Sequence, residues 1–350
     1  MNGGMEAMKF RDFTTKAGAR LHVSEIGFGT APLGDLYERL PEPQALETIE
    51  AAYRGGVNLF DSSPHYGNGL AELRVGAVLR GHPRDSYVFS TKIGRWMNPF
   101  QRVAPPSGDV ISPGFAGGTT HRATFDYSYD GVMKSIEQSL LRTGLDRIDI
   151  LLIHDVDVWT HGKDFEQRFR EAMEGAYPAL DALRKAGTLK AIGVGINEAD
   201  VCERFARAGD FDVMLMAGQY SLLLQPALES FLPLAVEKGI GIMLGGVFNS
   251  GILATGAVPG AKFNYRDAPP DVMQKVAKIE AICARHGVAL RTAAMRFALS
   301  HPAVISLVLG GVKPSEVTQN SADAGQDIPV ALWAELKAEG LLAPTAPTPG

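Results

Sequence analysis

Eight short runs of apolar residues recur along the chain, and each is followed by a longer segment with apolar residues at helical spacing. Runs that are apolar at every position are typical of parallel strands buried on both faces. The expected strands are 26–30, 58–63, 87–94, 148–155, 189–197, 212–221, 240–248 and 304–311. The expected helices are 43–55, 69–80, 130–143, 166–186, 199–208, 226–238, 270–286, 289–300 and one from 314 onward. This repeat predicts an α/β fold with a single (β/α)8 TIM barrel, and an open doubly wound sheet is the alternative.

The two ends of the chain depart from the repeat. We expect residues 1–8 to be a disordered leader or an alternative start, residues 9–341 to form the barrel, and residues 342–350 to be a disordered Pro-rich tail. Two short alternating runs flank Lys16-Ala17-Gly18 and predict an N-terminal hairpin that closes one mouth of the barrel. Residues 329–341 predict an extra C-terminal helix.

Residues 95–127 contain many Gly and Pro and predict a long irregular loop after the third strand. A loop of this length inside a compact domain is usually functional, and in a barrel it would overhang the C-terminal ends of the strands. Its aromatic residues Trp96, Phe100 and Phe115 are candidates to wall a substrate pocket. The alternative is a surface excursion that contacts no ligand.

Composition narrows the classes of function. The chain has 350 residues, of which 45% are hydrophobic and 21% charged, as in ordinary soluble proteins. A net charge of −5 argues against nucleic acid and anionic membranes as partners. No apolar stretch is long enough to span a membrane, and the N-terminus lacks the pattern of a secretory signal. The two cysteines, Cys202 and Cys283, indicate a reducing, cytoplasmic setting.

Four residues capable of acid/base chemistry follow three consecutive expected strands. Asp61 ends the second strand, Tyr66 lies five residues later, Lys92 ends the third strand and His154 ends the fourth. The C-terminal ends of barrel strands share one face, so these side chains should converge. A phenol normally has a pKa of about 10, and an adjacent ammonium lowers that pKa. With Asp61 holding Lys92 and His154 donating to a substrate oxygen, the set predicts proton transfer at a carbonyl or an alcohol.

Other chemistry is poorly supported. Each of the four residues has an ordinary structural interpretation by itself, such as a helix cap or a core histidine, and only their joint occurrence favours catalysis. The run Gly27-Phe28-Gly29-Thr30-Ala31-Pro32 ends in Pro where a dinucleotide fingerprint needs Gly. We expect no metal site, because the histidines lack Cys partners and ligand spacing. No GxSxG motif indicates a serine hydrolase.

The chain resembles the aldo-keto reductase superfamily over roughly residues 9–325. The resemblance lies in GFGTAPLG, NLFDSSPHYGNGLAE, the lysine of FSTKIG, LIHD, GVGIN, GQYS and the late Gly pair followed by Asn320. It implies a (β/α)8 barrel that binds a nicotinamide cofactor. It also implies that Tyr66 is the acid/base, that Lys92 and Asp61 tune it, and that His154 orients the substrate.

The same resemblance implies a set of cofactor contacts. Asn197 and Gln219 would bind the nicotinamide carboxamide, and Phe248 would pack on the nicotinamide ring. The other implied contacts are Gly29, Thr30, Asp61, Asn249, Ser250, Gly251, Leu253, Gly310, Gly311, Lys313, Glu316 and Asn320.

Glu316 bears on the choice between NAD and NADP. It stands where many members of the superfamily carry Arg or Gln facing the adenosine ribose. A carboxylate there accepts from a 2′-hydroxyl and repels a 2′-phosphate, so we expect NAD to be preferred. The ammonium of Lys313 is a weaker argument for NADP.

Within the superfamily, FDSSPHYGNGLAE, IHD and GGVFNSG resemble the bacterial branch of D-threo-aldose (L-fucose) 1-dehydrogenases and pyridoxal 4-dehydrogenases. This implies oxidation of an aldose at C1 to a lactone, with Trp96, Asp155 and Trp159 as candidate sugar contacts. The alternatives are an NADPH-dependent aldehyde or ketone reductase and, less favoured, a cofactor-binding regulatory subunit.

Overall fold

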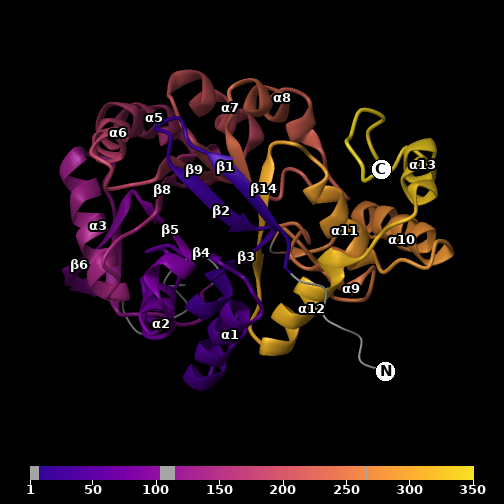
Figure 1. The fold of residues 1–350 in the computed structure, drawn as a ribbon, viewed down its shortest axis with the longest axis horizontal. Coiled ribbons are helices and arrows are strands. Elements are labelled where there is room, and N and C mark those ends of the chain that lie inside the picture. The colour runs from indigo at the N-terminus through magenta and orange to yellow at the C-terminus, as the bar shows by residue number, and fades with distance from the viewer. Residues whose placement is uncertain (1–7, 103–114, 265) are drawn as a thin grey trace.

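The computed structural model describes residues 8–102, 115–264 and 266–350. Eight parallel strands form a closed barrel in the order β3-β4-β5-β8-β9-β10-β11-β14 (Figure 1). The strands are β3 (Ile26–Gly29), β4 (Leu59–Asp61), β5 (Val88–Ile93), β8 (Ile150–His154), β9 (Ala191–Ile196), β10 (Val213–Ala217), β11 (Gly241–Gly245) and β14 (Val304–Gly310). The last strand pairs with the first, from Leu307 opposite Ile26 to Gly310 opposite Gly29. The barrel prediction is therefore confirmed and the open sheet is excluded.

Helices surround the barrel strands, as expected. They are α1 (Glu42–Arg54), α2 (Leu70–Leu79), α3 (Tyr129–Thr143), α5 (Phe165–Glu171), α6 (Tyr177–Lys185), α7 (Ala199–Ala208), α8 (Phe231–Glu237), α11 (Leu290–Leu299) and α12 (Pro314–Gly325), with short turns at α4 (Val158–His161) and α9 (Ile252–Thr255). The expected helix 166–186 is interrupted by one π-helical turn at Ala172–Ala176. The ends of α3 follow local chemistry, because the Ser128 side chain accepts from Gly131 N and Gly144 ends the helix at φ 63°.

The strands separate two buried apolar layers. Side chains such as Leu59, Ile150 and Leu152 fill the barrel interior, whereas Leu151 and Ile153 belong to the larger layer beneath the helices. Both faces of each strand are buried, and this is why the strands are apolar at every position.

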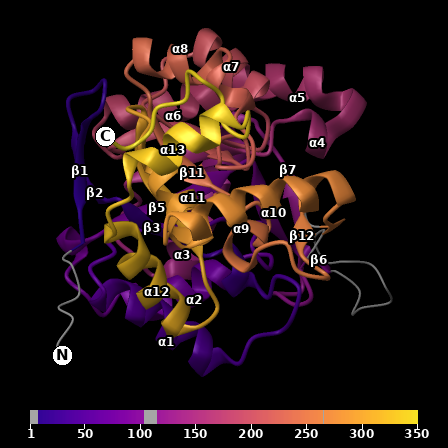
Figure 2. The same ribbon diagram turned by 90° about the vertical axis from the view of Figure 1, so that its right-hand side faces the viewer.

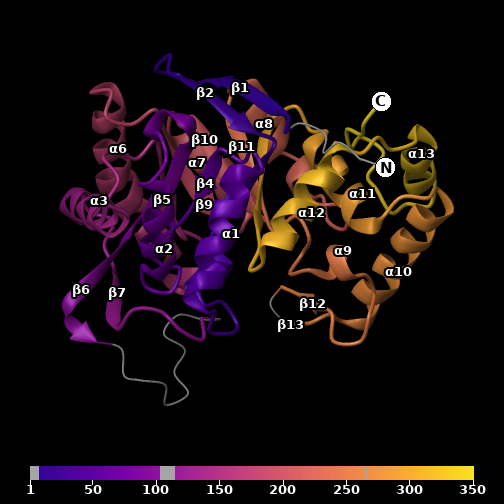
Figure 3. The same cartoon turned by 60° about the horizontal axis from the view of Figure 1, so that its bottom comes forward.

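The N-terminal hairpin closes the end of the barrel at which the strands begin. Strand β1 (Phe10–Thr14) pairs antiparallel with β2 (Arg20–Ser24), and Leu21 and Val23 join the apolar layer inside the barrel. Figure 3 shows this hairpin at the opposite end of the molecule from the pairs β6–β7 and β12–β13 (Lys262–Phe263 and Arg266–Asp267). The predicted plug is confirmed.

The segment after β5 is more regular than its composition suggested. Residues Arg95–Arg102 form β6 and pair antiparallel with β7 (His121–Phe125). The amide side chain of Gln138 on α3 bonds both the N–H and the C=O of Met97, at 2.8 and 2.9 Å. The prediction of an irregular loop over all of 95–127 was wrong, because the Gly and Pro residues lie mostly between two strands that pair at long range.

The C-terminal region adds α10 (Pro270–Arg285) and α13 (Val330–Ala338), which pack side by side outside the barrel (Figure 2). The tail that follows also packs: Leu342 and Ala346 are buried, and Lys337 Nζ donates to Ala346 O at 2.8 Å. This differs from the disorder expected for 342–350. The leader predicted for residues 1–8 lies, apart from Met8, outside the described residues.

Candidate active site

The four predicted catalytic residues meet at the C-terminal ends of three neighbouring strands. Asp61 ends β4, Lys92 lies in β5 and His154 ends β8, and these strands are adjacent in the barrel. The register places Asp61 opposite Ser90, and Lys92 opposite Leu152. Tyr66 comes from the segment between β4 and α2. Strand order alone therefore brings a carboxylate, an ammonium and an imidazole to one edge.

Lys92 and Asp61 form a buried ion pair. Lys92 Nζ donates to Asp61 Oδ2 at 2.6 Å and to Ser62 O at 2.7 Å, and Ser90 Oγ donates to Asp61 Oδ1 at 2.8 Å. Burial is the largest single effect and lowers the pKa of this ammonium, but the charges and hydrogen bonds of Asp61 and Tyr66 together outweigh burial and raise the pKa of Lys92. Lys92 is therefore a permanent cation at the floor of the site.

Tyr66 lies beside this cation. Lys92 Nζ is 4.9 Å from the centroid of the phenol ring, and Phe115 stacks on the same ring at a centroid distance of 6.2 Å. Burial raises the pKa of Tyr66 to about 12, while the charge of Lys92 pulls it down. Lys92 acts in the predicted direction, but burial exceeds its effect. Phe115 is thus the loop aromatic that walls the phenol.

His154 completes the set. Its ring centroid is 6.1 Å from that of Tyr66, at an interplanar angle of 87°. Burial, together with the positive charges of Lys92 and Arg95, holds the pKa of His154 well below its usual value. The imidazole is therefore neutral at physiological pH, and its N–H can serve as a hydrogen-bond donor.

Sequence reasoning missed two residues of this site, Ser63 and Arg95. Ser63 Oγ lies 3.2 Å and Arg95 Nη1 lies 3.3 Å from His154 Nδ1. Arg95 also pairs with Asp155 Oδ2 at 2.8 Å. One signal was available: Arg95 follows Lys92 by three residues, at the end of the strand where the catalytic groups gather.

The model of the Aldo/keto reductase family matches residues 25–329. The chain belongs to this family. It is 40% identical over 332 residues to a D-threo-aldose 1-dehydrogenase of Pseudomonas sp, with 94% of this chain and 97% of that protein covered. It is 39% identical over 327 residues to a pyridoxal 4-dehydrogenase of Microbacterium luteolum, covering 92% and 95%.

Solved structures show the same architecture. The holo form of an aldo-keto reductase from Bacillus halodurans superposes with a TM-score of 0.72 at 22% identity, covering 96% of this chain and 97% of that one. A glycerol dehydrogenase from Gluconobacter oxydans gives a TM-score of 0.69 at 20% identity, with 97% of each chain covered. The protein is thus an oxidoreductase with an aldo-keto reductase barrel.

Aldo-keto reductases use NAD(P)(H), and the predicted cofactor contacts of this member occupy the rest of the barrel rim. Apart from Asp61, which is also a member of the tetrad, they lie at or after the ends of β9, β10, β11, β14 and β3, which are consecutive in the closed sheet. The tetrad and the predicted cofactor residues therefore form two complementary arcs of one ring. By strand they are Asn197 after β9, Gln219 after β10, 248–253 after β11, 310–320 at and after β14, and Gly29 and Thr30 at the end of β3.

The residues on this second arc fit a polar ligand. Asn249 is buried, its Oδ1 accepts from Ser221 Oγ at 2.5 Å, and its Nδ2 has no hydrogen-bond partner among the described residues. A buried amide donor of this kind needs an acceptor. A Cβ at Gly310 would come within 2.7 Å of Pro32 Cγ, so a larger residue would crowd the rim. Unlike Asn249 Nδ2, the hydroxyl of Thr30 already has a hydrogen-bond partner, because it donates to Ser62 Oγ at 2.9 Å.

Several predicted cofactor residues in and after the turn that follows β14 form hydrogen bonds within the protein. Glu316 Oε2 accepts from Val312 N at 2.8 Å, so the carboxylate faces the backbone of this turn. Asn320 Oδ1 accepts from Arg291 Nη2 at 2.6 Å, and the Arg291 guanidinium lies 6.0 Å from the Phe248 ring centroid. Arg291, which the sequence did not single out, connects two of the predicted cofactor residues.

The predicted substrate contacts are spread out. Asp155 lies at the site beside His154, whereas the Trp96 ring faces Lys134 Nζ on α3 at 4.1 Å. Trp159 is 65% exposed and Phe100 is 93% exposed. The structure thus joins Asp155 and Phe115 to the tetrad and leaves the roles of both tryptophans as predictions.

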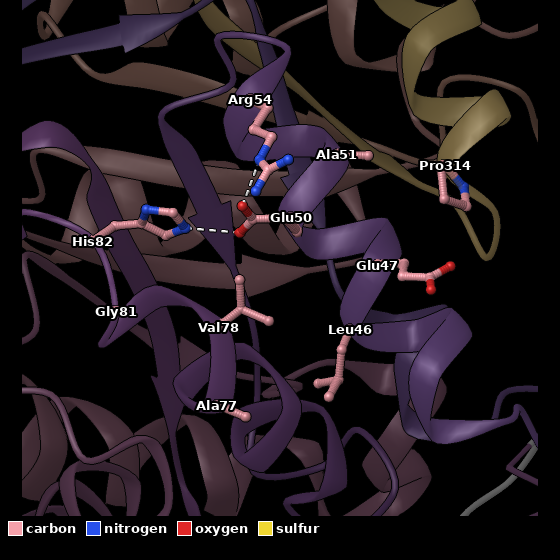
Figure 4. A pocket seen from close by; sticks show the side chains of 10 residues that line it. All are labelled: Leu46, Glu47, Glu50, Ala51, Arg54, Ala77, Val78, Gly81, His82 and Pro314. Atoms are coloured by element: carbon pink, nitrogen blue, oxygen red, sulfur yellow. Dashed lines mark hydrogen bonds and ion pairs between the residues drawn. The ribbon is translucent and has the colours of Figure 1, made fainter.

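A groove on the outside of the barrel lies between α1 and α2 (Figure 4). Three of its lining residues interact with one another, because Glu50 accepts from Arg54 at 2.6 Å and contacts His82 Nε2 at 2.7 Å. None of the tetrad lines it, so it is not the catalytic site. In the part of the chain that is described, no helix is long and apolar enough to cross a membrane, and no group of three His, Cys, Asp or Glu side chains could hold a metal.

Proposed function

We propose that this aldo-keto reductase oxidises an aldose at C1 to a lactone with NAD(P), and that Tyr66 is its acid/base. Support for the substrate class comes from the 40% identity to a D-threo-aldose 1-dehydrogenase over almost the whole of both chains. Support for the chemistry comes from one observation above all. The cation of Lys92, anchored 2.6 Å from Asp61, lies 4.9 Å from the Tyr66 ring, where it stabilises the negative charge of a phenolate.

Each group has a defined task in this reaction. The C1 hydroxyl would lie between Tyr66 and His154, and Tyr66 would take its proton. The C1–H bond breaks with its electron pair as the C1–O double bond forms, and the bound nicotinamide supplies the hydride acceptor. The neutral imidazole of His154 donates to the reacting oxygen and orients it. Lys92 and Asp61 remain in place throughout, which avoids reorganisation in the charged transition state.

We further propose that NAD is the preferred cofactor. Glu316 places a carboxylate on the turn after β14 and occupies the N–H of Val312, a donor that would otherwise be available to a phosphate. A second negative charge near this point is electrostatically unfavourable. Lys313 lies three residues earlier but is exposed, so its attraction for a phosphate is screened.

Pyridoxal is the second candidate substrate, because the chain is 39% identical to a pyridoxal 4-dehydrogenase. An aldose and pyridoxal each carry an aldehyde and a hydroxyl that can close to a cyclic hemiacetal, so one acid/base site serves both. A panel of aldoses and pyridoxal, followed at the absorbance of reduced nicotinamide with NAD and with NADP, separates the two. Turnover of an aldose with NAD supports the proposal. Turnover of pyridoxal alone replaces the substrate, and reduction of simple aldehydes with NADPH alone overturns it.

A further inference from the structure

Arg95 and Asp155 form a buried ion pair directly against His154. Arg95 begins β6, Asp155 follows β8, and less than a tenth of either residue is exposed. The guanidinium packs over the Phe125 ring at 4.2 Å, and the main-chain oxygen of Arg95 accepts from Ser135 Oγ at 2.9 Å. Arg95 is therefore held from the hairpin and from α3 while its charged end reaches the catalytic imidazole.

Two donors converge on one nitrogen of that imidazole. Arg95 Nη1 lies 3.3 Å from His154 Nδ1, and a guanidinium can only donate. Ser63 Oγ lies 3.2 Å from the same nitrogen and accepts from His65 N at 3.0 Å, which leaves its own O–H to donate. A nitrogen that receives donors cannot carry a proton, so the proton of the neutral ring resides on Nε2.

The other imidazole nitrogen, Nε2, faces the carboxylate of Asp155, which is paired with Arg95. His154 Nε2 is 3.2 Å from Asp155 Oδ1, and Asp155 Oδ2 is 2.8 Å from Arg95 Nη1. The main chain at Asp155 is left-handed, with φ 53°, a conformation that is unfavourable for a residue with a side chain unless its contacts hold it there. The ion pair with Arg95 is such a contact.

We propose that Arg95 is a positioning residue that fixes His154 as the tautomer with its proton on Nε2, the atom that serves the substrate oxygen. In the free site Asp155 Oδ1 lies 3.2 Å from Nε2, and the substrate oxygen would accept the N–H in its place. The inference rests on the proposed role of His154 in the reaction. It assigns no contact between Arg95 and the reacting atoms.

The charges around His154 predict what the loss of Arg95 does. Burial opposes protonation of the ring most strongly, and the cations Lys92 and Arg95 oppose it as well. The carboxylate of Asp155, 3.2 Å from Nε2, is the negative charge beside the ring. The groups that face the ring or its main chain are Lys92 on β5, Ser63, His65 and Tyr66 after β4, Arg95 on β6, Tyr127 before α3, and Asp155 after β8. Without Arg95, one cation is lost and Asp155 is left unpaired beside Nε2, and both changes favour the imidazolium.

The test is 15N NMR of the imidazole nitrogens in the cofactor-free protein between pH 5.5 and 9, with His154 assigned by a His154→Asn variant. We expect the wild type to show a neutral Nε2–H ring throughout. In the Arg95→Met variant, His154 should titrate within this range. The pH profile of kcat/KM for this variant should gain a limb that the wild type lacks, along which kcat/KM falls at least tenfold. Arg95→Lys should restore part of both.

Arg184→Met is the matched control. Arg184 is as buried as Arg95 and pairs with Asp212 at 2.9 Å, at the end of the barrel where the strands begin. The Arg184→Met variant should be less stable than the wild type, but its His154 should titrate as in the wild type. A wild-type Nδ1–H ring, or an Arg95→Met ring that matches the wild type, overturns the proposal. If Arg95→Met does not fold, the wild-type tautomer and Arg95→Lys decide it. The NMR titration needs no substrate, so failure to oxidise an aldose counts against the proposed function alone.

Discussion

Lys92 Nζ lies 2.6 Å from Asp61 Oδ2, and neither side chain leaves more than 2% of its surface exposed. Loss of one partner from a charge pair this deeply buried would leave the other charge unpaired and away from water, which is very unfavourable. The same contact therefore has a structural and a chemical consequence, and the two can be separated by mutation.

Lys92→Met should destabilise the protein and abolish most activity. Removal of the ammonium leaves a buried carboxylate without its partner, which costs about 3–5 kcal/mol of unfolding free energy. Urea denaturation measures this loss. The double variant Asp61→Asn with Lys92→Met removes both charges and should regain most of the stability but none of the turnover. Full turnover in the double variant would contradict the catalytic assignment.

Tyr66→Phe should keep the fold and lose the chemistry. The ring retains its contacts with Phe115 and His154, while the proton-transfer group disappears. General acid/base catalysis contributes about 10²–10⁴-fold, so kcat should fall by that factor with cofactor affinity unchanged in a fluorescence titration. Tyr87→Phe removes another buried phenol, before the start of β5, and should leave kcat unaltered. A kcat for Tyr66→Phe within a few-fold of the wild type would rule Tyr66 out.

Oxidation should accelerate with pH, whereas reduction should not. Burial raises the pKa of Tyr66 to about 12, so below that pH the deprotonated fraction grows roughly tenfold for each pH unit. Oxidation uses the deprotonated phenol as base, and reduction uses the protonated phenol as acid. We expect kcat/KM for oxidation to rise from pH 6.5 to 9.5 and kcat/KM for reduction to stay level. An oxidation rate independent of pH would mean that another group takes the proton.

Changes at Glu316 should alter cofactor choice. Glu316→Gln removes the charge that opposes a 2′-phosphate, and Glu316→Arg adds one that attracts it. The ratio of kcat/KM for NADP to that for NAD should rise about tenfold in the first variant, equivalent to about 1.4 kcal/mol, and further in the second. Lys313→Ala should lower the ratio. A wild-type enzyme that already prefers NADP, or a ratio unmoved by either Glu316 variant, would refute the assignment.

The hairpin plug should matter for stability and not for chemistry. Leu21 is buried and belongs to the apolar layer inside the barrel, at the end away from the tetrad. Leu21→Ala should lower the unfolding free energy by about 2–5 kcal/mol and leave kcat unchanged at 25 °C. Leu141→Ala, at a leucine 84% exposed on α3, should change neither. A large drop in kcat for Leu21→Ala would show that the plug shapes the active site.

Much of the fold of this protein could be predicted from short windows of its sequence. Buried parallel strands are apolar throughout and helices repeat every 3.6 residues, so the eight βα units were predictable from patterns within short windows. The C-terminal ends of barrel strands form one face, so the convergence of Asp61, Tyr66, Lys92 and His154 followed from the strand assignments. The hairpin plug was equally local, since a turn joins its two alternating runs.

Only the tertiary structure decided the rest. Arg95 meets His154 across 59 residues of chain, and β6 pairs with β7 across a Gly- and Pro-rich segment, so neither contact leaves a periodic trace. The pKa of Tyr66 depends on how far burial exceeds the charge of Lys92, and the tail packs because the C-terminal helices offer Leu342 and Ala346 an apolar surface. Burial and long-range contacts are sums over neighbours in space. The sequence specifies which chemical groups are present, and the fold determines which of them lie close together.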